Sequence, residues 1–148
     1  MLIIPSLFRL WAAITAKKNV PLAAGELLDD EQLPVYSVLV PLRDEAHMVA
    51  QLARALARLD YPPEKLDIKF VVEEASPRTI AAVQRYLGDA RFSLVIVPPR
   101  PPHTKPKALN FALPLARGAF VAVFDAEDVP ERLQLRKAAT IFARHPEI

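Results

Sequence analysis

The chain has 148 residues, of which 52% are hydrophobic, and these values suit a single globular domain with its own core. Nineteen basic and seventeen acidic residues are scattered along the chain, so no patch for binding nucleic acid is indicated. The absence of cysteine excludes a disulfide framework and a cysteine-ligated zinc site, and the three well-separated histidines argue against a histidine-based one.

The amino-terminal segment is apolar but short. Its first 16 residues contain Arg9 and are followed by Lys17 and Lys18, whereas a membrane-spanning helix needs about 20 apolar residues. The position of these charges does not fit a signal peptide. We expect residues 1–18 to be a membrane-proximal segment, and a helix packed on the domain is an equal alternative from hydropathy alone.

Beyond this segment, the chain divides into a linker and an alternating α/β region. Residues 19–34 are polar and acidic without an apolar period, which predicts a linker. In residues 35–148, apolar runs predict strands at Val35–Leu42, Ile68–Val72, Phe92–Val97 and Phe120–Phe124. Helical periodicity predicts helices at Ala46–Leu59, Thr79–Leu87, Lys107–Ala116 and Glu131–Arg144. Apolar strands separated by helices predict an α/β fold, with a mostly parallel sheet covered by helices on both faces.

Glycine is scarce, and this limits how phosphate can be bound. Only Gly25, Gly88 and Gly118 occur, so the chain has neither a dinucleotide-binding fingerprint nor a Walker A loop. Any phosphate must be held by side chains or by a metal ion. Ligands of parallel sheets lie at the carboxyl ends of the strands, where this chain places charged residues.

An acidic cluster follows the last predicted strand. Asp125, Glu127 and Asp128 leave the sheet at one point, and Mg²⁺ or Mn²⁺ bridging them to a diphosphate would relieve their repulsion. The alternative is a solvated turn whose acids cap the helix expected near Pro130.

A proline-rich segment between the third strand and the next helix ends in two lysines. Lys105 and Lys107 lie where lysine charge and a helix amino terminus both favour a phosphate. The alternative is an exposed polyproline ligand, since Pro98 and Pro101 have the PxxP spacing. Because the segment is embedded between a strand and a helix, we favour the phosphate interpretation.

Four short motifs together resemble a known family. They are Val-Pro-Leu-Arg-Asp-Glu at 40–45, Val-Val-Glu-Glu at 71–74, His-Thr-Lys-Pro-Lys-Ala-Leu-Asn at 103–110 and Phe-Asp-Ala-Glu-Asp at 124–128. In this order, each at a strand end, they resemble the GT-A domain of family 2 glycosyltransferases, closest to the membrane-embedded cellulose-synthase-like and phage-adsorption-protein-like branch. The resemblance extends from Val35 to the carboxyl terminus.

The resemblance implies roles for individual residues. The implied donor-binding residues are Pro41, Arg43, Glu45, Glu73, Glu74, Lys105, Asn110 and Asp125. Asp125 and Glu127 match the metal-binding Asp-x-Asp motif, which implies Mg²⁺ or Mn²⁺ as cofactor. Two departures bear on base specificity: Glu73 and Glu74 replace the usual Asp-Asp, and Ser76 with Pro77 replaces a Gly-Ser turn.

The implied activity is inverting transfer of a sugar from a nucleotide-diphospho-sugar to a glycan or lipid acceptor, at the cytoplasmic face of the inner (plasma) membrane. The family's Thr-Glu-Asp-like base motif and Gln-x-x-Arg-Trp motif do not occur in the sequence. We therefore expect a truncated GT-A domain, in which residues 35–148 form the donor-binding half without a catalytic base. The alternatives are a sugar-nucleotide nucleotidyltransferase, which should have a glycine-rich loop after the first strand, and a non-catalytic nucleotide-binding or scaffold module.

Overall fold

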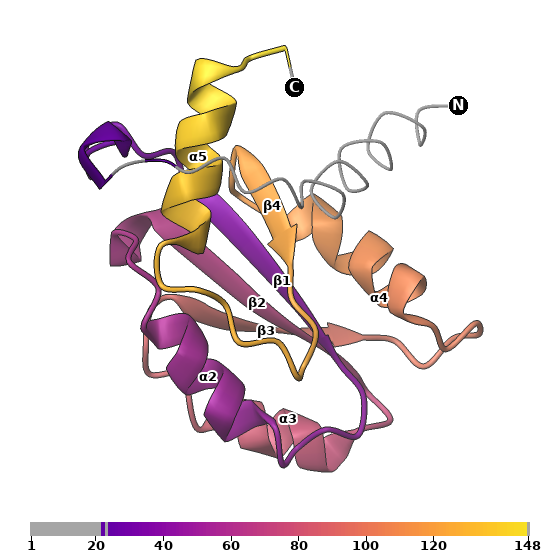
Figure 1. Cartoon of the computed structure of the whole chain (residues 1–148). Helices are drawn as coiled ribbons and strands as arrows, with labels where there is room; N and C mark the ends of the chain where they lie inside the picture. The colour runs from indigo at the N-terminus through magenta and orange to yellow at the C-terminus, as the bar shows by residue number, and fades with distance from the viewer. Residues whose placement is uncertain (1–21, 23, 148) are drawn as a thin grey trace.

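The computed structural model describes residues 22 and 24–147 (Figure 1). The predicted membrane-proximal segment 1–18 lies outside the described residues. Four strands form the sheet: β1 (Tyr36–Leu42), β2 (Leu66–Glu73), β3 (Phe92–Val97) and β4 (Phe120–Val123). The α-helices are α2 (Val49–Ala57), α3 (Pro77–Gln84), α4 (Lys105–Ala112) and α5 (Gln134–Arg144). Three short 3₁₀ helices join them: η1 (Ala24–Glu26), η2 (Pro63–Lys65) and η3 (Leu113–Leu115).

The sheet is entirely parallel and has the strand order β3-β2-β1-β4. From β1 the chain moves outward through β2 to β3, and then returns by way of α4 to the other side of β1. The strand order therefore reverses between β1 and β4. In open α/β sheets, ligands bind at such a reversal, outside the carboxyl ends of the strands.

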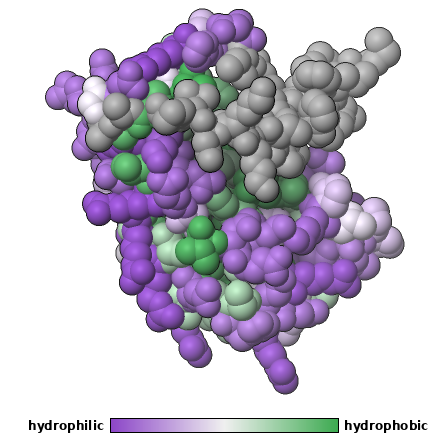
Figure 2. Space-filling view, in the orientation of Figure 1, coloured by the Kyte–Doolittle hydropathy of each residue, from purple (hydrophilic) through white to green (hydrophobic). Residues whose placement is uncertain are grey.

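Helices cover both faces of the sheet, as the alternation of side chains along the strands requires. On one face, Val38, Ile68 and Phe70 belong to a core cluster that also contains apolar residues of α2, α3 and α5. On the other face, Leu39 and Val71 pack in a smaller cluster with Ala108 and Ala112 of α4. Among the α-helices of the described residues, Figure 1 shows α4 on one side of the sheet and α2, α3 and α5 on the other. Figure 2 shows that hydrophilic residues dominate the surface seen in the same view.

The predicted elements all occur, but several helix ends differ from the prediction. Helix α4 begins two residues early, because the Thr104 hydroxyl caps it by accepting a hydrogen bond from the Lys107 amide. It ends at Ala112, and a 3₁₀ turn containing Pro114 follows. Helix α5 begins at Gln134 instead of Glu131. The α/β expectation is confirmed.

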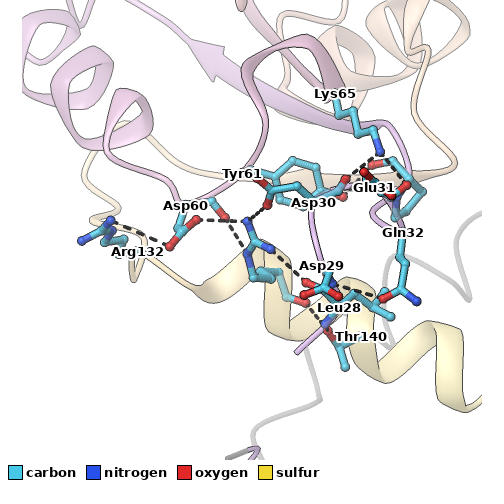
Figure 3. A network of polar contacts seen from close by, with 12 residues as sticks. Leu28, Asp29, Asp30, Glu31, Gln32, Asp60, Tyr61, Lys65, Arg132 and Thr140 are labelled. Carbon is cyan, nitrogen blue, oxygen red and sulfur yellow. Dashed lines mark hydrogen bonds and ion pairs between the residues drawn. The ribbon is translucent and has the colours of Figure 1, made fainter. Parts of the chain in front are cut away.

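Part of the predicted 19–34 linker is bound to the domain (Figure 3). Arg136 of α5 donates to the carbonyl oxygens of Leu28 and Asp60, and it pairs with the carboxylates of Asp30 and Asp60. Its side chain is only 11% exposed. Lys65 also donates to the Asp30 carbonyl at 2.7 Å. The chain therefore enters β1 along a defined path over α5.

A buried polar network lies at the amino ends of β1 and β2. Asp67 accepts hydrogen bonds from Ser37 Oγ at 2.7 Å and from Lys69 Nζ at 2.9 Å. The Arg117 amide donates to Asp67 at 3.1 Å, and the Gly118 amide donates to Ser37 Oγ at 2.8 Å. Burial raises the pKa of Asp67, but the hydrogen bonds to this carboxylate and the charge of Lys69 outweigh burial and hold its pKa below its ordinary value.

Candidate functional site

The predicted site residues gather at the carboxyl ends of the strands, around the strand-order reversal. The loop after β1 and the loop after β4 flank this point, and the β3–α4 connection reaches it from the far side of the sheet. Arg43 contacts His103 and Lys105 contacts Asp125, which joins the β3–α4 connection to the loops after β1 and β4. Asp44 contacts Ser76, which joins the loop after β1 to the loop after β2.

Pro41 is a buried residue of β1, a central strand, where proline is normally excluded. Its position is explained by the short neighbouring strand. The ladder between β1 and β4 ends at Leu39 and Val123, and Leu39 O then accepts from the Phe124 amide. Pro41 lies two residues beyond Leu39 and so directs its missing N–H toward the gap that opens where β4 has ended.

The loop after β1 is held in a defined conformation. Glu45 folds back so that its Oε2 accepts from the Arg43 amide at 3.1 Å. Asp44 adopts a left-handed φ of 53°, and its carboxylate accepts from Ser76 Oγ at 2.9 Å. The exposed Arg43 side chain donates to the His103 carbonyl at 3.2 Å. This loop is therefore connected to the loops after β2 and β3.

The two glutamates at the end of β2 differ in their surroundings. Glu73 is buried, with a side chain only 8% exposed, and its Oε2 lies 2.9 Å from Nδ1 of His103. Glu74 is exposed, and its amide donates to the Val97 carbonyl. The structure places Glu73 beside the His103 ring, whereas the Glu74 side chain faces solvent.

Lys105 connects the start of α4 to the acidic cluster after β4. Its Nζ lies 2.8 Å from Oδ1 of Asp125, and both side chains are about half exposed. This hydrogen bond raises the pKa of Lys105, and the negative charges of Asp125, Glu45 and Glu127 raise it further, against the opposing effect of burial. The exposed ammonium group is thus paired with Asp125 and also experiences the negative charge of one carboxylate from the loop after β1 and a second from the loop after β4.

Lys107 and Asn110 of the 103–110 motif are oriented differently from Lys105. Lys107 Nζ donates to the carbonyl of Pro98 at 3.0 Å and to that of Arg100, so it fastens the proline loop and does not reach the acidic cluster. Lys107 therefore has other partners than Lys105, and its expected role in binding phosphate stays a prediction. Asn110 is exposed and lies five residues after Lys105, about 140° around the helix axis. Its donor-binding role stays a prediction.

The acidic cluster is not a helix cap. Helix α5 begins at Gln134, beyond the cluster, and no side chain caps it. Asp128 Oδ2 instead accepts from the Asp125 amide at 2.6 Å, so Asp128 stabilises the turn itself. The carboxylates of Asp125 and Glu127 do not take part in this hydrogen bond. Within residues 22 and 24–147, no group of three or more acidic or histidine side chains is arranged to hold a metal ion.

Three connecting residues are not among the site residues that the sequence predicts: Asp44, Ser76, which is noted only as a departure from the family motif, and His103. All three lie within or beside the recognised motifs, so their neighbourhood was visible in the sequence. Their partners were not, because the contacts of Asp44 with Ser76 and of His103 with Glu73 span about 30 residues, from one loop to another.

Comparison with known proteins identifies the class. Residues 34–148 match the model of the family described as Glycosyltransferase like family 2. This match covers more than half of the chain, and the chain belongs to this family.

Two curated relatives illustrate the likeness. The chain is 29% identical over 122 residues to the "Probable glycosyltransferase YdaM" of Bacillus subtilis (strain 168), which covers 81% of this chain and 28% of that protein. It is 33% identical over 97 residues to the "Beta-monoglucosyldiacylglycerol synthase" of Trichormus variabilis, which covers 64% of this chain and 20% of that protein. The chain therefore spans less than a third of the length of either relative.

Solved structures show the same fold. The mannosyltransferase PcManGT from Pyrobaculum calidifontis, in complex with GDP-Man and Mn²⁺, matches with a TM-score of 0.68 and 29% identity over 94% of this chain and 40% of that chain. TarS from S. aureus in complex with UDP-GlcNAc matches with a TM-score of 0.65 and 25% identity over 75% of this chain and 32% of that chain. The resemblance to family 2 and the GT-A fold class are both confirmed. No helix within the described residues is long and apolar enough to span a membrane.

Proposed function

We propose that residues 35–148 bind the nucleotide-diphospho-sugar donor of a family 2 glycosyltransferase, and that the diphosphate lies beside Lys105 and the acidic loop after β4. The observation that carries this proposal is the position of Lys105 at the strand-order reversal, where its ammonium group contacts Asp125. Its exposure leaves this ammonium accessible to an anionic ligand. The GDP-Man and UDP-GlcNAc complexes of the two structural neighbours support a donor of this class.

A divalent cation fits the donor set of this site. Asp125 and Glu127 offer hard carboxylate oxygens, and Mg²⁺ commonly takes only one or two carboxylates from the protein and completes its coordination with phosphate and water. Asp125 and Glu127 as the two protein ligands would match that pattern. When bound, Mg²⁺ or Mn²⁺ would neutralise the charge that develops on the departing diphosphate. The ammonium group of Lys105 would bind the same diphosphate.

The nucleoside would lie nearer β2, against Glu73 and the loop after β1. Arg43, Glu45 and the buried Glu73 are the groups available there, and the contacts of Arg43 and Glu73 with His103 hold them in place. We propose inverting transfer to a glycan or lipid acceptor for the whole protein, in polysaccharide or glycolipid synthesis at the cytoplasmic face of the plasma membrane. Membership in the glycosyltransferase family favours this reaction over nucleotidyl transfer.

Calorimetric titration of the chain with UDP and GDP, with and without Mn²⁺, tests donor binding. We expect Mn²⁺ to tighten binding of one of these nucleotides, and Asp125→Asn to remove most of that enhancement. Glu131→Gln is the matched control, because Glu131 is an exposed acid of the same connection that pairs with Lys137, away from the cluster. Equal affinity with and without metal would contradict the metal assignment, and no nucleotide binding at all would contradict the proposed function.

A further inference from the structure

His103 makes two contacts that join predicted nucleotide-binding groups from different loops. Its backbone carbonyl accepts from Nη1 of Arg43 at 3.2 Å, and Nδ1 of its ring lies 2.9 Å from Oε2 of Glu73. Arg43 follows β1, Glu73 ends β2, and His103 precedes α4. One residue therefore connects three loops at the carboxyl ends of the strands.

The contact of His103 with Glu73 is important because the Glu73 carboxylate is buried. The Glu73 side chain is 8% exposed and the His103 side chain 42% exposed, so a partly exposed ring contacts an almost enclosed carboxylate. A carboxylate with so little access to water needs a hydrogen-bond donor from the protein. The contact of Oε2 with the ring fixes the orientation of the carboxylate. Its other oxygen, Oε1, can then accept a hydrogen bond from another donor.

The position of His103 is itself fixed from both sides. On the carboxyl side, Thr104 caps α4 through the Lys107 amide. On the amino side, Lys107 Nζ holds the carbonyls of Pro98 and Arg100, so the proline loop is fastened to the same helix. The lysine that does not reach the acidic cluster thus supports the loop that carries His103.

We propose that His103 is a positioning residue for the nucleoside part of the donor: it orients the Glu73 carboxylate and the Arg43 side chain, so that Glu73 accepts from N–H or O–H groups of the base or ribose. This inference rests on the proposed function. It separates the site into two parts, with Lys105 and Asp125 serving the diphosphate and His103, Glu73 and Arg43 serving the nucleoside.

The test compares ligands that share the diphosphate but differ in the nucleoside. Calorimetric titrations with UDP, GDP and inorganic pyrophosphate, all with Mn²⁺, are made on the 148-residue chain and on His103→Leu, which fills similar space but cannot donate. We expect affinity for the preferred nucleotide to fall about tenfold, the effect of a lost hydrogen bond to a charged group, and pyrophosphate affinity to stay unchanged. His103→Gln, whose amide can donate to Glu73, should restore much of the loss.

Two controls make the result specific. His145→Leu removes the other histidine–glutamate contact, an exposed one with Glu147 at the far end of α5, and should change none of the affinities. In a Glu73→Gln background, His103→Leu should have little further effect, because the two residues act through one contact.

Each contrary outcome has a defined meaning. Wild-type affinity for the preferred nucleotide in His103→Leu overturns this inference alone. A parallel loss of pyrophosphate affinity also overturns it, because it would show that His103 merely holds the loop that leads to Lys105. If the wild-type chain binds neither nucleotide, the proposed function fails, and this inference fails with it.

Discussion

The two ends of the sheet use the same kinds of charged residue in opposite ways. At the amino ends, Lys69 and Asp67 form a pair whose side chains are 10% and 4% exposed, and neighbouring groups bind the remaining oxygen of Asp67. At the carboxyl ends, Lys105 and Asp125 form a pair of similar length whose side chains are 58% and 47% exposed. The first pair belongs to the interior of the fold, and the second is open to a ligand.

Electrostatics explains why the buried pair and the exposed pair contribute differently to stability. Charges that are buried and hydrogen-bonded are costly to separate, because removing one partner leaves the other without water or a counter-charge. An exposed pair contributes little to stability, since water solvates each partner almost as well. The comparison therefore predicts that substitutions at the amino ends change the free energy of unfolding, and that substitutions at the carboxyl ends change ligand binding.

The largest effect is expected for Asp67→Asn. This change leaves Lys69 buried without its counter-charge and should lower the free energy of unfolding by about 4 kcal/mol, measured by urea denaturation. Adding Lys69→Met to Asp67→Asn should recover part of the loss, because the uncompensated charge is then removed. A cost below about 1 kcal/mol for the single variant would show that the buried pair is not a main support of the fold.

The contribution of the Asp67 carboxylate should also appear in the pH dependence of the free energy of unfolding. The pKa of Asp67 is lowered in the folded state, so its contribution is fully present above its ordinary pKa and is lost as the pH falls through the lower, folded-state value. Urea denaturation from neutral to acidic pH should show a decline in stability that is shallower in Asp67→Asn. An equally steep decline in both proteins would assign the acid sensitivity to other groups.

Gly118→Ala should be the next most damaging change. A Cβ at this position would lie 2.6 Å from the Phe120 carbonyl oxygen and would also press on the Ser37 amide, and both are backbone atoms that cannot rotate away. We expect a loss of about 3 kcal/mol in thermal or urea unfolding. Gly88→Ala is the control, since nothing lies within 4 Å of the added atom, and it should be nearly neutral.

Arg136→Leu tests the attachment of the entering chain to α5. The variant loses the hydrogen bonds to the Leu28 and Asp60 carbonyls together with two ion pairs, and we expect it to cost about 2 kcal/mol. Arg132→Leu is the matched control, because Arg132 is exposed and reaches Asp60 only at 3.8 Å. Hydrogen exchange should locate the lost protection in residues 26–34, and unchanged exchange there would contradict this role.

The smallest effect on stability is expected for Lys105→Ala, which should change the free energy of unfolding by no more than about 0.5 kcal/mol. Its effect should appear in binding. The affinity for UDP or GDP should fall while the affinity for the corresponding nucleoside hardly changes, because Lys105 is assigned to the diphosphate. If nucleotide and nucleoside weaken alike in calorimetry, Lys105 is a structural residue.

Local patterns in the sequence were sufficient to predict the fold class and to predict which end of the sheet carries the site. Apolar runs separated by amphipathic segments require a parallel sheet with two covered faces, and the charged residues directly after those runs must then share one edge. Asp125 and Lys105 were identified on this basis together with the motif resemblance, and the structure joins them at 2.8 Å. Helix ends were less accurate, because caps such as Thr104 compete with apolar periodicity.

Tertiary structure alone decided which of these residues touch. The strand order places β4 beside β1 and brings the acidic loop to Lys105, and no local pattern encodes that return crossing. Lys105 and Lys107 look equivalent in the sequence, yet one reaches Asp125 and the other fastens the proline loop, because positions two apart on a helix point in different directions. The contact of His103 with Glu73 likewise depends on how two loops pack, and packing is a property of the folded chain rather than of any segment within it.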